Sequence, residues 1–171
     1  MDEQVATLIM PTESLASNFL IMADEYQAAG DDRYQSAVVD FSAYLNSLMD
    51  YSAGIGLPPG RVPSTTYWLA SGDHLIGRSS LRHHLTPDLE SEGGHIGYDI
   101  RPSERRKGYG TIILKLTLEK AKGLGLKRVL ITCDTDNMAS VKIIEKNGGE
   151  VERQSISGRS GKLISRYWVG L

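Results

Sequence analysis

Residues 101–126 read RPSERRKGYGTIILKLTLEKAKGLGL, and this stretch decides the fold prediction. Three cations, Arg105 to Lys107, run into Gly108-Tyr109-Gly110 and then into an apolar-rich segment with helical spacing. Glycine lets a ligand approach the backbone closely, and the first amides of a helix bind anions. The stretch therefore predicts a turn that receives a phosphate group, with Gly108 and Gly110 keeping its space clear of side chains. The alternative is an ordinary strand-to-helix turn with a solvated basic rim.

The spacing of the glycines argues against two common nucleotide-binding loops. No Gly-Lys-Ser/Thr follows them, as a Walker loop requires, and Ile112 and Ile113 stand where the dinucleotide fingerprint needs its third glycine. A second cluster, Gly54-Ile55-Gly56, is followed by prolines rather than by a helix and predicts a linker or flexible lid.

The segments around this turn predict an α+β fold. Before it, the patterns indicate a strand at 5–11, helices at 12–29 and 34–51, and strands at 64–71, 74–85 and 93–101. After it, they indicate a helix at 108–122, a strand at 127–133, a helix at 138–147 and strands at 149–156 and 162–170. This order predicts a single domain over residues 1–171 with a central mixed β-sheet flanked by helices.

Composition and charge exclude several classes of protein. The net charge is −2, with 19 Lys and Arg against 21 Asp and Glu, so no global field favours nucleic acid or a membrane as partner. Cys133 is the single cysteine, and no Cys/His spacing predicts a metal site. The acidic N-terminus resembles neither a signal peptide nor a membrane anchor, so we expect a cytoplasmic protein.

Two motifs in this order resemble the GNAT acyltransferases. Arg105-x-x-Gly108-x-Gly110, which follows the strand HIGYDI and opens a helix, is similar to the acyl-CoA-binding signature of that family. Downstream, NMASVKIIEKNGG at 137–149 is similar to its second signature. The resemblance covers roughly residues 93–151 and implies a central mixed sheet in which the strands at 96–100 and 127–133 begin parallel and then splay apart.

The resemblance also implies where acetyl-CoA binds. Backbone amides from Arg106 to Gly110, and that of Thr111, would hold the CoA pyrophosphate, and the strand from Ile96 to Ile100 would pair with the pantetheine arm. The candidate cofactor-binding residues are Ile96, Tyr98, Ile100, Arg105, Arg106, Lys107, Gly108, Tyr109, Gly110, Thr111, Asn137 and Ser140. Asn137 is equally suited to cap the helix that it opens.

Acyl transfer to an amine requires a base for the ammonium proton and an acid for the departing thiolate. His95, expected on the strand beside the slot, is the first base candidate, and its alternative role is a satisfied hydrogen bond in the core. Glu92 is the second base candidate. Many family members carry a tyrosine acid where Ile144 stands here, which leaves Tyr109 and Tyr98 as the available phenols. Cys133 is interpreted as a small buried residue rather than a nucleophile.

The sequence therefore predicts an N-acetyltransferase, in the class of acyltransferases that transfer groups other than aminoacyl groups. It uses acetyl-CoA without a metal and acts by direct attack of a primary amine. The expected acceptor is a small-molecule amine or a peptide or protein amine, and acidic residues near the N-terminal helices suit a cationic one. A homodimer is left open. A non-catalytic acyl-CoA sensor and a binding module for another phosphate ligand are the rival functions.

Overall fold

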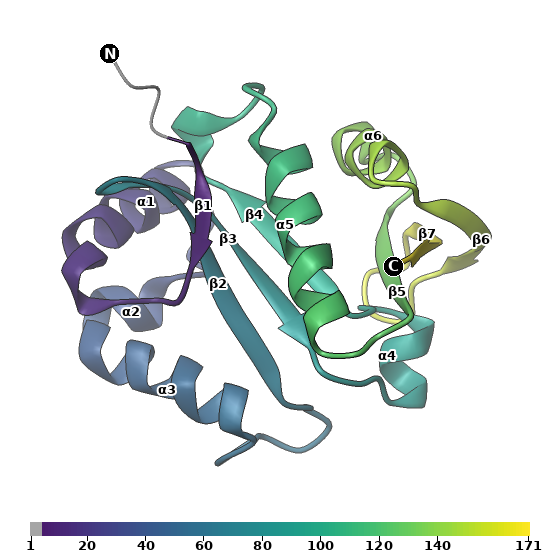
Figure 1. The fold of residues 1–171 in the computed structure, drawn as a ribbon, viewed down its shortest axis with the longest axis horizontal. Coiled ribbons are helices and arrows are strands. Elements are labelled where there is room, and N and C mark those ends of the chain that lie inside the picture. Colours follow the sequence, from purple (N-terminus) through teal and green to yellow (C-terminus); the bar gives the residue numbers. More distant parts are fainter. Residues whose placement is uncertain (1–4) are drawn as a thin grey trace.

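The computed structural model describes residues 5–171, so the first four residues of the acidic N-terminus lie outside the description. The strands of this region form two antiparallel sheets, one in the order β1-β2-β3-β4 and one in the order β5-β7-β6 (Figure 1). The strands are β1 Thr7–Ile9, β2 Ser64–Ser71, β3 His74–Arg82, β4 Ile96–Ile100, β5 Arg128–Asp134, β6 Glu150–Ile156 and β7 Leu163–Gly170.

Helices α3 to α6 begin at short polar side chains or a glycine, as their local sequences favour. Asp40 caps α3 by accepting from the amide of Ala43, and Thr86 caps α4 by accepting from the amide of Leu89. The α-helices are α1 Ala16–Ala28, α2 Gln35–Val39, α3 Phe41–Ala53, α4 Pro87–Ser91, α5 Tyr109–Gly123 and α6 Met138–Lys146, and the 3-10 helices are η1 Glu13–Leu15 and η2 Pro102–Glu104.

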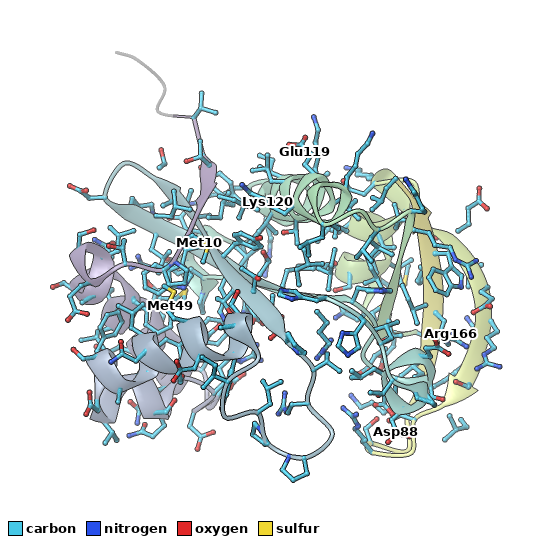
Figure 2. The ribbon with its side chains drawn as sticks, turned by 60° about the horizontal axis from the view of Figure 1, so that its bottom comes forward. Met10, Met49, Asp88, Glu119, Lys120 and Arg166 are labelled. Atoms are coloured by element: carbon cyan, nitrogen blue, oxygen red, sulfur yellow. The ribbon has the colours of Figure 1, made fainter. Side chains whose placement is uncertain are left out.

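The first sheet is covered on both faces. Phe19 of α1 stacks on Trp68 of β2 at a ring-centroid distance of 4.9 Å, so α1 to α3 pack on one face. Helix α5 covers the other face, where Ile113 packs against Leu69 and Ile76. Side chains alternate between the two faces in the middle of β2, which contributes Trp68 to the core under α1 and Leu69 to the core under α5. Glu119 and Lys120 point outward from α5 (Figure 2).

The two sheets meet at one short junction between the segment before β4 and strand β5. An isolated bridge pairs Gly94 with Ile131, and the amide of His95 donates to the carbonyl of Leu130 at 2.7 Å. Beyond it no ladder joins β4 to β5 among the described strands, so these two strands splay. A shared core beneath the splay includes Ile96, Leu114 and Ile131, and it holds the sheets together.

The structure differs from the sequence prediction at several places. The strand pairs within both sheets are antiparallel, so the expected parallel start of β4 and β5 is not formed as a ladder. The helix expected over 34–51 is two helices, because Asp40 adopts an extended backbone to cap α3. Helix α4 replaces part of an expected loop. Among residues 5–171, no helix has the length and apolar character that crossing a membrane requires.

Candidate active site

A cavity of about 630 Å³ lies where the C-terminal end of β4 meets the N-termini of α5 and α6. Residues from the predicted phosphate turn and from the second motif line it together, although about 30 residues separate them in the chain. The predicted residues that line this cofactor cavity are Tyr98, Ile100, Arg105, Arg106, Gly108, Tyr109, Gly110, Thr111, Asn137 and Ser140.

The turn at the start of α5 presents free backbone donors. Within residues 5–171, none of the amides of residues 106–110 donates to a protein group, and Gly108 caps the helix with φ 86°. The amide of Thr111 instead donates to the carbonyl of Gly108 at 3.1 Å, so it is less available to a pyrophosphate than predicted. Arg106 also has a left-handed φ of 63°, which turns successive amides toward one side. This arrangement suits a pyrophosphate.

Strand β4 presents a free edge to the same cavity. The amides of Arg82 and Arg101 bond to the carbonyls of His95 and Ile76, so odd-numbered residues of β4 face β3. The backbone groups of Ile96, Tyr98 and Ile100 therefore point away from β3, toward the splay. The Ile100 carbonyl is already occupied there, because it accepts from the Tyr26 hydroxyl at 2.9 Å and from Arg105 Nε at 3.2 Å.

Three of the predicted cofactor-binding residues have contacts that differ from a direct role in binding CoA. The side chain of Ile96 is buried in the shared core, and Lys107 forms an ion pair with Glu104 at 3.0 Å outside the cavity lining. A Cβ on Gly110 would lie 2.4 Å from Ile143 Cδ1. Gly110 therefore permits α5 to pack against α6, whereas a Cβ on Gly108 would meet no atom within 4 Å.

Tyr98 is one of the residues that line the cofactor cavity, and its hydroxyl group lies beneath the cavity surface. Its oxygen is buried and has no hydrogen-bond partner within residues 5–171. Burial raises the pKa of Tyr98 to about 12, although the neighbouring Ser140 hydroxyl lowers it. The phenol is therefore protonated at neutral pH and is available as a donor. Tyr109 lines the same cavity from the first position of α5.

His95 lies at the junction of the two sheets, beside the splay. It precedes β4, it is only 7% exposed, and its Nδ1 accepts from the amide of Leu130 at 3.0 Å. Burial, and to a smaller extent the charge of Arg82, lowers its pKa to about 4. A neutral imidazole that accepts at Nδ1 carries its proton on Nε2. No lone pair of His95 is then free, and its geometry fits the core hydrogen bond rather than the base.

Glu92, the second base candidate, lies outside the lining of the cofactor cavity. It is half-buried at the end of α4, and its Oε1 accepts from the Ser157 hydroxyl at 2.7 Å. The next residue, Gly93, donates its amide to the Thr132 hydroxyl at 3.0 Å, which ties this segment to β5. Glu92 therefore lies beside the junction of the two sheets.

Helix α6 contains most of the second motif. Asn137 caps it by accepting from the amide of Ser140 at 3.2 Å. Ile144 is fully buried in the shared core, so no side chain at this position reaches the cavity. Burial raises the pKa of Cys133 to about 11, which keeps this thiol protonated and opposes a nucleophilic role.

Sequence reasoning missed part of the cavity wall. Tyr26 and Arg33 reach it from α1 and the segment that follows, where the sequence showed only a helical apolar face. Asp99, Glu104, Ala139, Lys142 and Ile143 complete the lining. Asp99 bonds to Arg33 and accepts from the Tyr34 hydroxyl at 3.2 Å. No group of three or more His, Cys, Asp or Glu is placed to hold a metal within residues 5–171.

A model of the acetyltransferase (GNAT) domain matches residues 41–150. The chain belongs to the GNAT acetyltransferase family. This membership confirms the predicted family and the predicted enzyme class. No curated protein sequence matches this GNAT chain significantly.

Solved structures confirm the α+β fold of this GNAT protein. An acetyltransferase from Salmonella typhimurium that modifies the N-terminal serine of ribosomal protein L7/L12 is 15% identical, with a TM-score of 0.71 over 99% of this chain and 96% of that chain. RimL, an L7/L12 α-N-acetyltransferase solved with coenzyme A, is 16% identical, with a TM-score of 0.72 over 99% and 96%. MccE, a microcin C7 self-immunity acetyltransferase solved with acetyl-CoA and AMP, is 15% identical, with a TM-score of 0.74 over 97% and 92%.

Proposed function

We propose that the protein transfers an acetyl group from acetyl-CoA to a primary amine by direct attack, without a covalent enzyme intermediate. One observation carries the proposal: a single cavity joins the free amides of residues 106–110 to the free edge of β4. The amides suit a pyrophosphate, and the strand edge suits the amide-bearing pantetheine arm. Family membership and the CoA and acetyl-CoA complexes of RimL and MccE support this reading.

Within this proposal, Glu92 accepts the proton of the attacking amine and Tyr98 donates one to the departing thiolate. Glu92 is preferred to His95 because its carboxylate has lone pairs free, whereas His95 Nδ1 accepts from the Leu130 amide and Nε2 then carries the proton. Tyr98 is preferred to Tyr109 because its buried hydroxyl has no hydrogen-bond partner within residues 5–171. A buried donor without a partner is costly and indicates that a ligand supplies the acceptor.

The binding of CoA is tested with a matched pair at Gly108. Asp and Asn have nearly the same size and both tolerate the left-handed backbone of this position, but only Asp places a negative charge beside the pyrophosphate. Calorimetry should show that Gly108→Asp binds CoA about tenfold or more weakly than Gly108→Asn, a difference of about 1.4 kcal/mol. Equal affinities of the two variants would remove the turn from the CoA site.

The chemistry is tested by Glu92→Gln and Tyr98→Phe, which preserve shape and remove one function each. Loss of a positioned base or acid slows transfer by about 10²–10⁴-fold, and CoA affinity should stay unchanged. Thiol release at saturating acetyl-CoA measures the effect. Tyr109→Phe is the matched control, since the proposal predicts a rate close to that of the parent.

Turnover also separates the enzyme from its rival. A non-catalytic sensor would bind acetyl-CoA without releasing thiol in the presence of any amine. We propose a small-molecule or peptide amine as acceptor, a class supported by the N-terminal serine that the Salmonella enzyme modifies. Cytoplasmic localisation, a single domain and a homodimer stay predictions.

A further inference from the structure

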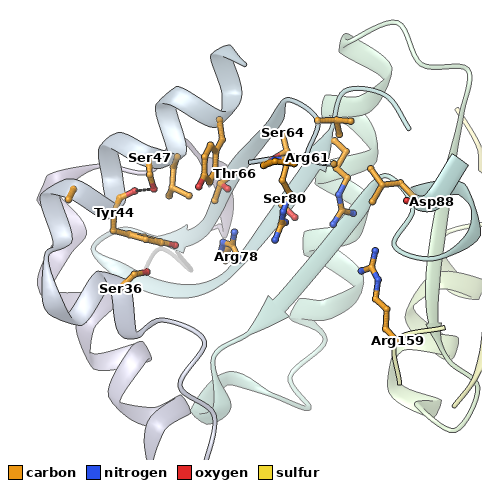
Figure 3. A pocket seen from close by; sticks show the side chains of 18 of the residues that line it. Ser36, Tyr44, Ser47, Arg61, Ser64, Thr66, Arg78, Ser80, Asp88 and Arg159 are labelled. Carbon is orange, nitrogen blue, oxygen red and sulfur yellow. Dashed lines mark hydrogen bonds between the residues drawn. The ribbon is translucent and has the colours of Figure 1, made fainter. Parts of the chain in front are cut away.

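A second cavity, of about 770 Å³, lies on the α3 side of the first sheet (Figure 3). Its floor is formed by alternate residues of β2 and β3, including Thr66, Arg78 and Ser80, because side chains two residues apart share a face. The loop after Gly54 and the β6–β7 turn contribute Arg61 and Arg159 to its walls. A volume of this size suits a small organic ligand.

Positive charge dominates this cavity. Four arginines line it, Arg61, Arg78, Arg82 and Arg159, against Asp40 and Asp88. The Asp40 carboxylate caps α3, and Asp88 lies in the first turn of α4, where the helix dipole stabilises it. Within residues 5–171, neither aspartate forms a salt bridge with these arginines, and only Arg78 approaches a carboxylate, at 4.0 Å from Asp99.

Two of these guanidinium groups repel that of Arg82. Burial lowers the pKa of Arg82, and the charges of Arg61 and Arg159 lower it further, so both of these arginines lie within electrostatic range of Arg82. In Figure 3, Arg61 and Arg159 extend toward one another from opposite walls. Like charges held together without a counter-ion destabilise the folded state. A bound anion would relieve this repulsion.

Two donors in the lining also lack acceptors. The Tyr44 hydroxyl and Arg78 Nε are buried and have no hydrogen-bond partner within residues 5–171. Buried donors in native proteins are nearly always paired, and a ligand bound in this cavity would supply the acceptor. Both groups can donate to an oxyanion, and Arg78 cannot accept.

The arginines are linked to the proposed base and to the cofactor cavity. Arg82 Nη1 donates to the carbonyls of Gly93 and Gly94, directly after Glu92. The amide of Arg159 donates to the Ser157 hydroxyl, which in turn donates to Glu92. On the other side, Arg78 faces Asp99, which lines the cofactor cavity.

We propose that this cavity is the acceptor site and that its arginines bind a carboxylate or phosphate group carried by a small amine substrate. The proposal rests on the acetyltransferase function proposed above. It reverses the cationic acceptor that the acidic residues of the N-terminal helices suggested, because those side chains do not set the charge of the cavity. Arginine binds carboxylate and phosphate in the same bidentate manner, so the shared chemistry is the oxyanion.

The test is a series of amines on one aminoalkyl chain that ends in a carboxylate, a phosphate, a carboxamide or a guanidine. With acetyl-CoA, thiol release should give a kcat/KM for an anionic amine about tenfold or more above that of the carboxamide, about 1.4 kcal/mol. The guanidine should be the poorest substrate. The carboxylate and phosphate arms show which oxyanion is preferred, and a carboxamide as good as either overturns the proposal.

Two exposed arginines supply the variants. Arg61→Gln and Arg159→Gln should each raise KM for the anionic amine about tenfold and leave KM for the carboxamide and for acetyl-CoA unchanged. Lys115→Gln, an exposed cation on α5 outside both cavities, is the control and should match the parent. An anionic-amine KM that neither arginine variant changes overturns the proposal.

Calorimetry with CoA distinguishes a failure of the acetyltransferase function from a failure of the acceptor site. A protein that does not bind CoA overturns both the function and this site. A protein that binds CoA and acetylates all four amines equally overturns the acceptor site alone. If no amine is acetylated, titration of the CoA-loaded protein decides: tighter binding of the carboxylate than of the carboxamide supports the site, and equal binding overturns it.

Discussion

The environment of His95 shows how one buried residue changes the chemistry of a site. Its imidazole accepts from the Leu130 amide and lies 6.5 Å from the Trp168 ring, between the two sheets. Burial there disfavours the charged form. His95 therefore serves the junction as a neutral acceptor, and the carboxylate of Glu92, three residues earlier, stands beside the same junction.

The low pKa of His95 predicts acid sensitivity. In the unfolded chain a histidine has a pKa near 6.5, and in the folded protein the pKa of His95 is about 4. Between these values the unfolded chain binds a proton that the folded chain does not, so stability is present above pH 6.5 and falls as the pH drops toward 4. The loss from this residue is on the order of 3 kcal/mol.

Urea unfolding between pH 4 and 7 measures this loss. His95→Asn keeps an acceptor for the Leu130 amide and should be less stable at pH 7 but less sensitive to acid than the parent. His84→Asn, at an exposed histidine, should keep the parent's slope. If the free energy of unfolding falls equally with pH in the parent and in His95→Asn, His95 does not cause the acid sensitivity.

At the scale of elements, α1 holds the segment that leads into the phosphate turn. Glu25 accepts from Arg101 Nε at 2.7 Å and from the amide and hydroxyl of Ser103 at 3.0 Å each. Burial raises the pKa of Glu25, but the hydrogen bonds from Ser103 and Arg101 outweigh it, and the net pKa is lowered. One carboxylate thus connects α1 to the end of β4 and to η2.

Removal of this carboxylate should affect both stability and CoA binding. Glu25→Ala leaves Arg101, which is 7% exposed, without its partner, and we expect a loss of about 2–4 kcal/mol of unfolding free energy. KM for acetyl-CoA should rise because η2 loses its anchor. Asp24→Ala, at the exposed neighbouring position, is the control for thermal unfolding and kinetics. An unchanged melting temperature in Glu25→Ala would mean that this network does not stabilise the fold.

At the scale of the whole molecule, the two sheets depend on a contact that only glycine allows. Gly94 has φ 63°, and a Cβ there would lie 2.4 Å from the carbonyl oxygen of Leu130. The close approach lets β5 bond to the segment before β4, and the splay that forms the cofactor cavity begins directly after it. Cavity shape and sheet junction are therefore coupled.

Gly94→Ala should separate the sheets locally. The left-handed backbone and the clash with Leu130 together should cost about 2–4 kcal/mol, and acetyl transfer should fall because Glu92 and β4 flank the junction. The control is Gly123→Ala, at the end of α5, where a Cβ meets nothing within 4 Å. It should leave the rate of acetyl transfer unchanged and leave the stability unchanged or slightly higher. Denaturant unfolding and thiol release measure the two effects. Parent-like stability in Gly94→Ala would mean that the junction tolerates a side chain.

The sequence by itself determined most of the elements and the family. Strand β2 and most other boundaries follow from apolar spacing and turn residues, which act between neighbours in the chain. The phosphate turn was predictable for the same reason, since Gly108 and the helix that it caps are contiguous. Most residues of the cofactor cavity could be named because two local motifs supply them.

The tertiary structure alone decided which groups are free to react. His95 and Glu92 are close in sequence, yet Leu130 occupies the nitrogen of one and Ser157 binds the other, and both partners come from distant strands and turns. Arg61, Arg82 and Arg159 are spread over about 100 residues, so their convergence on one cavity has no local signal. Burial and electrostatic fields arise from packing between distant segments, and a linear pattern does not record them.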